Sequence, residues 1–146
     1  MDQRGSICSN LTTCLKSAFV FTLRSFAVSK SCTCGAIIIS NHGGRQLDGS
    51  RAPFDQVKAI SDAVGDKIEI ILDGGIRRGT HVLKAIAAGA KACSIGKGFL
   101  FSLSAGGQEG VEKMLSNMRE EIYRDMVLMG CKNIKELNFS KLIYRK

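Results

Sequence analysis

The sequence contains no tryptophan and only two tyrosines, and aromatic residues make up only 6% of it. Proteins that bind single-stranded nucleic acids combine basic side chains with aromatic ones, on which the bases stack. Lysine and arginine number 21 against 13 acidic residues, a net charge of +8, yet no basic run is interleaved with aromatic residues. Charges of both signs alternate along the helical segments after Gly35, which is typical of solvated helix faces. We therefore expect no nucleic-acid partner.

Long apolar runs and metal-binding patterns are absent as well. The apolar run at residues 18–23 ends at an arginine and is far shorter than the roughly 20 residues that cross a bilayer, so membrane association is not indicated. No Cys-x-x-Cys pattern occurs, and Cys32 and Cys34 are too close together for a zinc-binding pair. The only histidines, His42 and His81, are not spaced to complete such a site. No metal site is predicted.

The six cysteines are scattered and lack the dense spacing of a secreted disulfide framework. Cys93 lies in an apolar run and Cys131 follows a predicted helix end, so both are predicted to be buried thiols. This pattern favours a reducing compartment such as the cytoplasm.

Residues 1–34 differ in composition from the rest of the chain. They are rich in serine, threonine and cysteine, and Asp2 is their only acidic residue. We expect a poorly ordered N-terminal extension, followed by one globular domain over residues 35–146. A basic, serine-rich and acid-poor start is also typical of organelle-targeting segments, and this alternative stays open.

From Gly35 onwards, apolar strands alternate with amphipathic helices. Three short apolar segments have the composition of strands that are buried on both faces, as in parallel sheets. One helix is predicted from Pro53 to a stop at Gly65, and a second from an N-cap at Thr80 to a stop at Gly89. The strands are expected at residues 36–40, 68–72 and 92–95.

This order predicts an α/β fold with right-handed βαβ units and a parallel sheet. The periodicity fits both a barrel and an open sheet. The last third of the chain is predicted to be helical, because apolar residues recur at three- and four-residue steps from Val111 to Met129, with Gly130 as the stop.

The loop after the first predicted strand, SNHGGRQ at residues 40–46, contains a histidine and an arginine. The carboxyl ends of parallel strands are where α/β enzymes carry their active sites. His42 is a candidate base that takes a proton, and Arg45 is a candidate for binding a carboxylate on the same substrate. The alternatives are that His42 is an ordinary turn residue and that Arg45 pairs with Asp48.

The other two strand ends are rich in glycine and basic residues. Glycines let backbone N–H groups approach an anion, and the following helices direct their positive ends toward it. This composition predicts a phosphate site, although neither loop has a Walker or G-x-G-x-x-G pattern. Asp73 has the alternative role of capping its own loop. The glycines are Gly74, Gly75, Gly79, Gly96 and Gly98, and the basic residues are Arg77, Arg78 and Lys97.

Two segments resemble a known family. The string SNHGGRQLD, followed about two dozen residues later by LDGGIRRGTHVLKAIAAGAKACSIGKGFLF, resembles the C-terminal part of the FMN-dependent L-2-hydroxy acid dehydrogenases and oxidases. That family includes L-lactate dehydrogenases, lactate oxidases and glycolate oxidases. The resemblance runs from about Gly35 to about Leu142. It implies the C-terminal portion, the last three β/α units, of a TIM (β/α)8 barrel.

The resemblance also implies roles for the loop residues. His42 matches the base that takes a proton from the substrate, and Arg45 matches the arginine that binds its carboxylate. The segment that holds the FMN cofactor is matched by Asp73, Gly74, Gly75, Arg77, Gly96 and Lys97. The implied reaction is FMN-dependent oxidation of a small-molecule L-2-hydroxy acid, with L-lactate as the first candidate, to the 2-oxo acid.

Two departures from the family pattern matter. Where the family usually has Gly-Arg-Pro, this chain has Gly96-Lys97-Gly98, so the positive charge stays but the bidentate guanidinium is lost. A TIM barrel also takes about 250 residues and eight strands, and only three strands are predicted here. We therefore expect a truncated fragment that is inactive alone.

Two alternatives to this interpretation remain. One is a non-catalytic half-barrel that binds phosphate, complements a separate N-terminal half or forms a homo-oligomer. The other is another phosphate-binding barrel enzyme, such as a nucleotide dehydrogenase.

Overall fold

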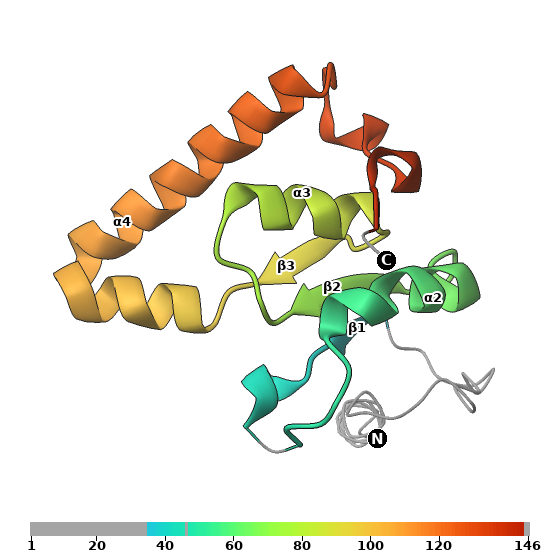
Figure 1. Ribbon diagram of the computed structural model, residues 1–146, viewed down its shortest axis with the longest axis horizontal. Coiled ribbons are helices and arrows are strands. Elements are labelled where there is room, and N and C mark those ends of the chain that lie inside the picture. Colours follow the sequence, from blue (N-terminus) through green and yellow to red (C-terminus); the bar gives the residue numbers. More distant parts are fainter. Residues whose placement is uncertain (1–34, 46, 145–146) are drawn as a thin grey trace, which may run out of the picture.

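The computed structural model describes residues 35–45 and 47–144, and the predicted extension over residues 1–34 lies outside them. Strands alternate with helices in the first half of this region, and a long helix and two short 3-10 helices follow (Figure 1). The elements are β1 (Ala36–Ile39), η1 (His42–Gly44), α2 (Pro53–Val64), β2 (Glu69–Asp73), α3 (Gly79–Ala87), β3 (Ala92–Ser94), α4 (Lys97–Leu128), η2 (Ile134–Glu136) and η3 (Phe139–Lys141).

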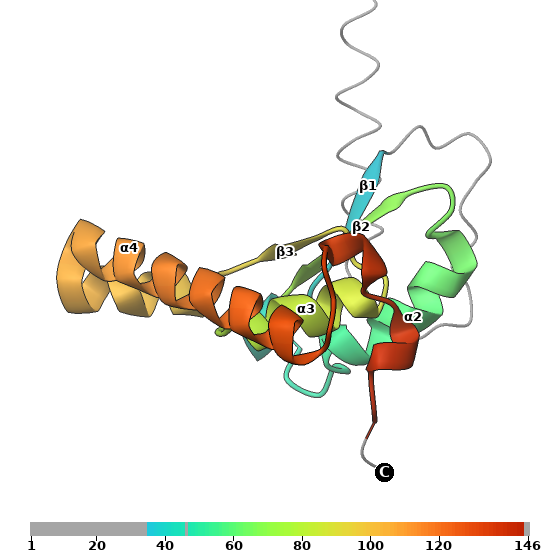
Figure 2. The same cartoon turned by 90° about the horizontal axis from the view of Figure 1, so that it is seen from above.

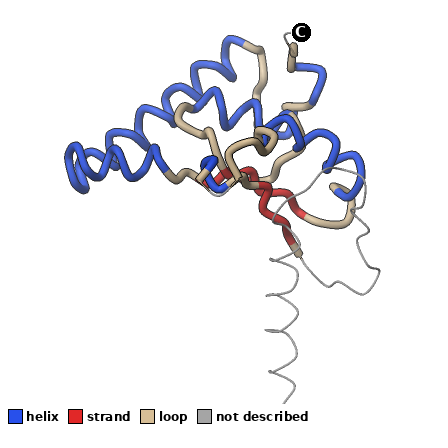
Figure 3. The backbone as a smooth tube through the Cα atoms, turned by 60° about the horizontal axis from the view of Figure 1, so that its bottom comes forward, coloured by secondary structure: helices blue, strands red, loops and turns tan. Residues whose placement is uncertain are grey.

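The three strands form one parallel sheet in the order β1-β2-β3 (Figure 1), and Figure 3 shows them in red. In its register, Ile37 lies beside Ile70, and Leu72 lies beside Cys93. Helix α2 connects β1 to β2 and α3 connects β2 to β3, since parallel neighbours need a crossover connection. The predicted βαβ organisation is therefore confirmed, and the carboxyl ends of the three strands meet at one edge.

Both connecting helices cover the same face of the sheet (Figure 2). Buried side chains alternate along β1 and β2, and they pack in one cluster with Val57 of α2 and Ala85 of α3. A closed barrel has all its helices on one face of its sheet, whereas a doubly wound sheet has them on both faces. The arrangement therefore favours the barrel over the open sheet.

The opposite face of the sheet is left open by the described residues. Ile38, on that face, is 41% exposed, and Ile71 beside it is only partly buried. The strands were predicted to be buried on both faces. Within the part of the chain that the structure describes, they are buried only on the face that α2 and α3 cover. In a closed barrel the open face would point to the interior, where side chains from the other strands would cover it.

Helix α2 has the predicted bounds. Pro53 occupies its first turn, where the missing N–H costs no hydrogen bond, and Gly65 follows its last residue. Val57 is fully buried against Ile70 and Leu72, which are each 1% exposed. Burying side chains of this size contributes roughly 1.5–3 kcal/mol each, so this layer between α2 and the sheet is the centre of the core.

The start of α3 differs from the prediction of an N-cap at Thr80. The cap residue is Arg78, and the backbone N–H of Gly79 donates to a carboxylate oxygen of Glu121 on α4 at 2.7 Å. Thr80 instead donates its hydroxyl to Asp125, also on α4, at 2.7 Å. The prediction was wrong because a carboxylate from a distant helix takes the place of a local capping side chain.

Helix α4 begins earlier than predicted, at Lys97 rather than near Val111, and Figure 1 shows it as two limbs. The limbs meet at Gly106 and Gly107, where the backbone is not helical and Gly107 has a φ of 56°. The predicted stop is confirmed, because the helix ends just before Gly130, whose φ is 67°.

The two described cysteines differ in burial. Cys131 is buried, as predicted, whereas Cys93 on β3 is only partly buried. Burial raises the pKa of the Cys93 thiol to about 11, so that the thiol stays protonated and poorly nucleophilic at neutral pH. Among the described residues, no helix is both long enough and apolar enough to span a membrane.

Replacing Glu121 by glutamine tests the cap that joins α3 to α4. The N–H of Gly79, and next the guanidinium of Arg78, hold the pKa of the Glu121 carboxyl below its usual value. The carboxylate therefore stabilises the fold at neutral pH, and this stabilisation is lost as the pH falls through the lowered pKa. Glutamine keeps one acceptor oxygen but loses the negative charge that faces the helix start and Arg78, so we expect E121Q to unfold in urea with about 1 kcal/mol less stability at pH 7.

The matched control is E109Q, at an exposed glutamate of the same helix, which we expect to change stability by less than about 0.5 kcal/mol. The difference between E121Q and the parent protein should shrink as the pH is lowered below the ordinary range of glutamate. Equal stability of E121Q and the parent at every pH would contradict the capping role.

Candidate functional site

The ends of β1 and β2 are joined by a side-chain hydrogen bond. The hydroxyl of Ser40 donates to a carboxylate oxygen of Asp73, across 33 residues of sequence. This contact brings the loop of His42 next to the loop that begins at Asp73, as expected from their places at one sheet edge. Asp73 therefore does more than cap its own loop, which was the alternative considered from the sequence.

The turn that carries His42 is held by polar side chains that precede it. The backbone N–H of His42 donates to the Ser40 hydroxyl at 3.0 Å, and the N–H of Gly43 donates to the Asn41 side chain at 3.1 Å. The N–H of Gly44 completes the turn with the Asn41 carbonyl at 3.0 Å. The residues after β1 therefore form a tight 3-10 turn rather than an open loop.

His42 has a left-handed backbone conformation with a φ of 54°, the only positive φ of a non-glycine residue in the described chain. This conformation is strained for a residue with a side chain, and such strain is concentrated at functional sites. The side chain is exposed at the carboxyl edge of the sheet. The turn therefore presents the His42 side chain to solvent at this edge.

Arg45 follows the turn directly and is exposed. The ion pairs among the described residues join Lys58 to Asp62, Arg78 to Glu121 and Arg124 to Asp125, so Arg45 does not pair with Asp48. Its guanidinium is thus an unneutralised cation close in sequence to His42. A planar fork of N–H donors in this position can bind a carboxylate with two parallel hydrogen bonds.

The loop after β2 exposes its backbone through two glycines. Gly74 and Gly75 have φ values of 107° and 77°, which favour glycine. A Cβ atom at Gly74 would lie 3.3 Å from the ring of Pro53, whereas one at Gly75 would meet nothing within 4 Å. The N–H of Arg77 donates to Nδ1 of His81 at 3.3 Å, so the loop is also tied to α3. The backbone at Gly75 is therefore open to a ligand.

The first turn of α4 follows β3 and starts with N-cap Gly96, and no side chain caps it. The first N–H groups of a helix have no partner within the helix, so this end can bind an anion. Lys97 begins the helix, and its ammonium group donates to the carbonyl of Gly43 at 3.3 Å. The third strand end thus contacts the turn of His42, and the three loops form one connected edge.

The two arginines of the second loop have different surroundings. Arg78 pairs with Glu121 at 3.0 Å and supports the junction of α3 and α4. Arg77 is exposed and lines a shallow depression beside α4, together with Lys113 and Glu121. Arg78 is thus engaged in an ion pair within the fold, whereas no ion pair within the described residues engages Arg77.

These residues fit the phosphate end of a flavin nucleotide. The site offers two cations, Arg77 and Lys97, an uncapped helix start at Gly96, and open backbone at Gly75. A phosphate group carries up to two negative charges and accepts several N–H bonds, which is what such a set of donors supplies. The donor set is therefore chemically suited to a phosphate group.

Sequence reasoning missed Ser40, Asn41 and Glu121. Ser40 and Asn41 were seen only as loop residues, although their side chains fix the turn of His42. Serine and asparagine often bond the backbone two residues on, so this pattern was a usable signal. Glu121 lies 42 residues from Gly79, and no local pattern predicts its capping contact.

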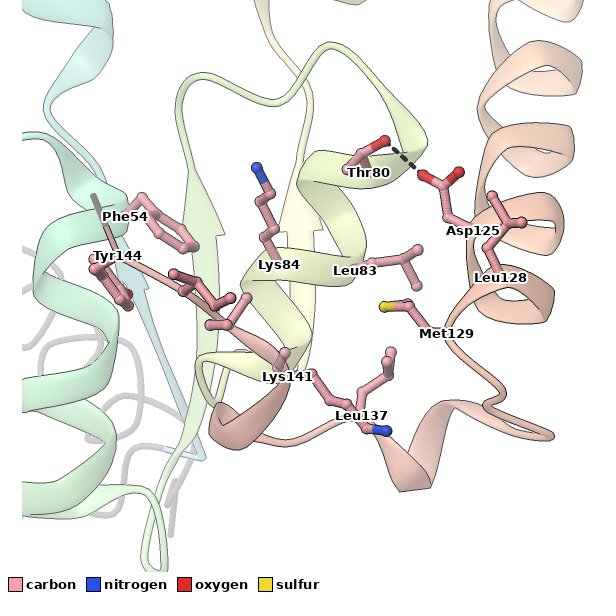
Figure 4. A pocket seen from close by; sticks show the side chains of 13 residues that line it. Phe54, Thr80, Leu83, Lys84, Asp125, Leu128, Met129, Leu137, Lys141 and Tyr144 are labelled. Carbon is pink, nitrogen blue, oxygen red and sulfur yellow. Dashed lines mark hydrogen bonds between the residues drawn. The ribbon is translucent and has the colours of Figure 1, made fainter.

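An apolar groove lies elsewhere, between α2, α3, the end of α4 and the C-terminal segment (Figure 4). Leu83, Leu128 and Met129 line it, and the bond from Thr80 to Asp125 lies at one end. None of the predicted site residues lines this groove. The predicted site residues lie instead at the strand ends, where polar groups converge.

Comparison with known proteins identifies the family of the chain. Residues 24–144 match a family described as FMN-dependent dehydrogenase. An L-lactate oxidase of Nostoc sp. is 48% identical over 107 residues, which are 73% of this chain and 29% of that protein. 2-Hydroxyacid oxidase 1 of Mus musculus is 46% identical over 110 residues, 75% of this chain and 29% of its own length.

Solved structures show the same likeness. A variant of flavocytochrome b2 with sulfite bound has a TM-score of 0.68 and 44% identity, and the match covers 73% of this chain and 29% of that one. The chain spans less than a third of the length of the relatives that it matches. The fold is confirmed as part of the barrel of these flavoenzymes, and the chain belongs to the FMN-dependent dehydrogenase family.

Proposed function

We propose that the described residues supply the base, the carboxylate-binding arginine and the cofactor-phosphate loops for FMN-dependent oxidation of a 2-hydroxy acid to a 2-oxo acid. The observation that supports this proposal best is the bonding of one turn to both neighbouring loops. The turn of His42 contacts Asp73 through Ser40 and contacts Lys97 through Gly43. A base, a cation and an anion site therefore share one edge.

His42 acts on the hydroxyl group of the substrate. Oxidation of a 2-hydroxy acid removes the hydroxyl proton and the hydrogen on the α-carbon, and two electrons leave with that hydrogen. The imidazole takes the hydroxyl proton, which favours formation of the carbonyl group of the product. FMN, when bound, would supply the acceptor for the two electrons and the α-hydrogen.

Arg45 sets which end of the substrate faces the base. The guanidinium binds the carboxylate in a bidentate manner, which fixes the α-carbon and its hydroxyl close to His42. Only two residues, Gly43 and Gly44, separate His42 from Arg45 in the sequence, and in this proposal a small acid contacts both side chains. The relatives are named for L-lactate and for 2-hydroxy acids, and L-lactate is the first substrate to test.

The phosphate of the cofactor is held by the second and third loops in this proposal. Arg77 and Lys97 supply positive charge, Gly75 and Gly96 supply open backbone, and Asp73 fixes the second loop against Ser40. Gly74 lies against Pro53 and keeps the loop close to α2. None of these residues takes part in proton transfer, since each is assigned to binding or positioning.

A second candidate function is that of a half-barrel that pairs with further strands. Within the described residues β1 and β3 each have one unpaired edge, and the open sheet face carries the exposed Ile38. The first limb of α4 is also apolar and exposed, with Leu100 at 56% and Phe101 at 63%. Such edges and faces favour pairing with another segment of polypeptide. We propose that activity requires five further strands from outside the described residues.

The activity can be tested by complementation. The chain is expressed with FMN, either alone or together with the N-terminal five β/α units of the Nostoc sp. L-lactate oxidase. We expect L-lactate-dependent dye reduction only from the combined sample, and we expect H42Q to lower it by about 10²- to 10⁴-fold, the usual contribution of a general base. Turnover by the chain alone, or undiminished turnover by H42Q, would contradict the proposal.

Replacing Arg45 by lysine tests the carboxylate assignment in the same complemented sample. A lysine keeps the charge but not the bidentate fork, so we expect kcat/KM for the 2-hydroxy acid to fall by about 10- to 100-fold, the loss of one charge-assisted hydrogen bond. Flavin binding, followed by quenching of FMN fluorescence, should not change. R51K, at an exposed arginine nearby, is the matched control. An equal loss of flavin binding in R45K would place Arg45 at the cofactor instead.

A further inference from the structure

We propose that Lys97 is a positioning residue, which links the anion-binding start of α4 to the turn that carries His42. Its ammonium group donates to the carbonyl of Gly43 at 3.3 Å, and 54 residues separate the two in sequence. An anion that binds at the start of α4 therefore acts on the same ammonium group that holds the turn. The identity of that anion, a flavin-nucleotide phosphate, rests on the proposed function.

The packing around Gly43 supports a specific contact. A Cβ atom at Gly43 would lie only 3.4 Å from both Cε and Nζ of Lys97, so the end of the lysine lies directly over this glycine. Gly43 also has a φ of 68°, which favours glycine. The backbone conformation therefore disfavours a side chain at this position, and the end of Lys97 lies within van der Waals distance of it.

The turn has a conformation that needs support. His42 is held at a positive φ, and its neighbours are fixed by bonds from Ser40 and Asn41 on the β1 side. Lys97 holds the turn from the β3 side through the Gly43 carbonyl. The orientation of His42 therefore depends on contacts from the end of β1 and from the start of α4. Of these contacts, the one made by Lys97 lies in the predicted phosphate site.

A lysine is suited to this double role. Its ammonium group has three donors, so one bond to Gly43 leaves two for an anion. Lys97 is also the first residue of α4, whose start has no side-chain cap and therefore unpaired N–H groups. In this proposal one residue thus links anion binding at the start of α4 to the histidine turn.

The test uses the ¹⁵N-labelled full chain and the variant K97M, with K91M as the matched control. Lys91 is an exposed lysine at the opposite end of β3. The amide of Gly44 shares its peptide group with the Gly43 carbonyl, so its resonance reports directly on the lysine bond. Without ligand, we expect K97M to shift the Gly44 resonance and to speed its hydrogen exchange several-fold, whereas K91M leaves both unchanged. An unchanged Gly44 in K97M would overturn the link.

The second arm adds FMN, inorganic phosphate or riboflavin. In the parent protein we expect FMN and phosphate to move the resonances of His42 and Gly44, and riboflavin, which has no phosphate, to leave them in place. In K97M these two resonances should not respond, although Gly75 and Arg77 still do. Equal responses of Gly44 in K97M and the parent would overturn the inference. No response of Gly75 or Arg77 to FMN in the parent would instead contradict the proposed cofactor site and, with it, the coupling to a phosphate.

Discussion

A hydrogen bond between the Ser40 hydroxyl and the Asp73 carboxylate joins the ends of two parallel strands, and the arrangement of the site depends on it. The same hydroxyl accepts the N–H of His42, so one serine fixes both the histidine turn and the first residue of the glycine-rich loop. Hydrogen bonds to charged groups contribute about 1.5–3 kcal/mol, which is enough to hold two short loops together. The base and the anion-binding loop are thus placed by a contact that neither loop provides alone.

The junction of α3 and α4 decides which helix start remains for an external anion. Glu121 already occupies the start of α3 by accepting the N–H of Gly79 and the guanidinium of Arg78. The start of α4 has no side-chain cap, and Lys97 adds positive charge there. A helix start that is filled by an internal carboxylate repels a phosphate, so in the proposed function the start of α4 is the one that receives the cofactor phosphate.

Much of this fold follows from local sequence. The apolar runs, Pro53 and Gly65 mark the strands and α2 correctly, because their signals depend on neighbours within a few residues. The start of α3 was mispredicted because Glu121 caps it from another helix. The first limb of α4 was missed because Gly106 and Gly107 interrupt its periodicity.

The candidate site, too, has features that the sequence shows and contacts that it does not. Its residue types were visible in the sequence, since each strand end carries its own histidine, glycines or cations. The contacts that join the loops, from Ser40 to Asp73 and from Lys97 to Gly43, span 33 and 54 residues and have no local signature. A sequence therefore shows which loops are chemically suited to a site, whereas the register of the sheet decides which of them meet.

The central claim, that the strand ends form one coupled site, is tested most directly by a double-mutant cycle on Ser40 and Asp73. The free energy of unfolding is measured in urea for the parent protein, S40A, D73A and the double variant. Because the two side chains are hydrogen-bonded, the account predicts a coupling energy of about 1 kcal/mol or more. If the loss of unfolding free energy in the double variant equals the sum of the two single losses to within about 0.3 kcal/mol, the two loops are independent, which would contradict the account.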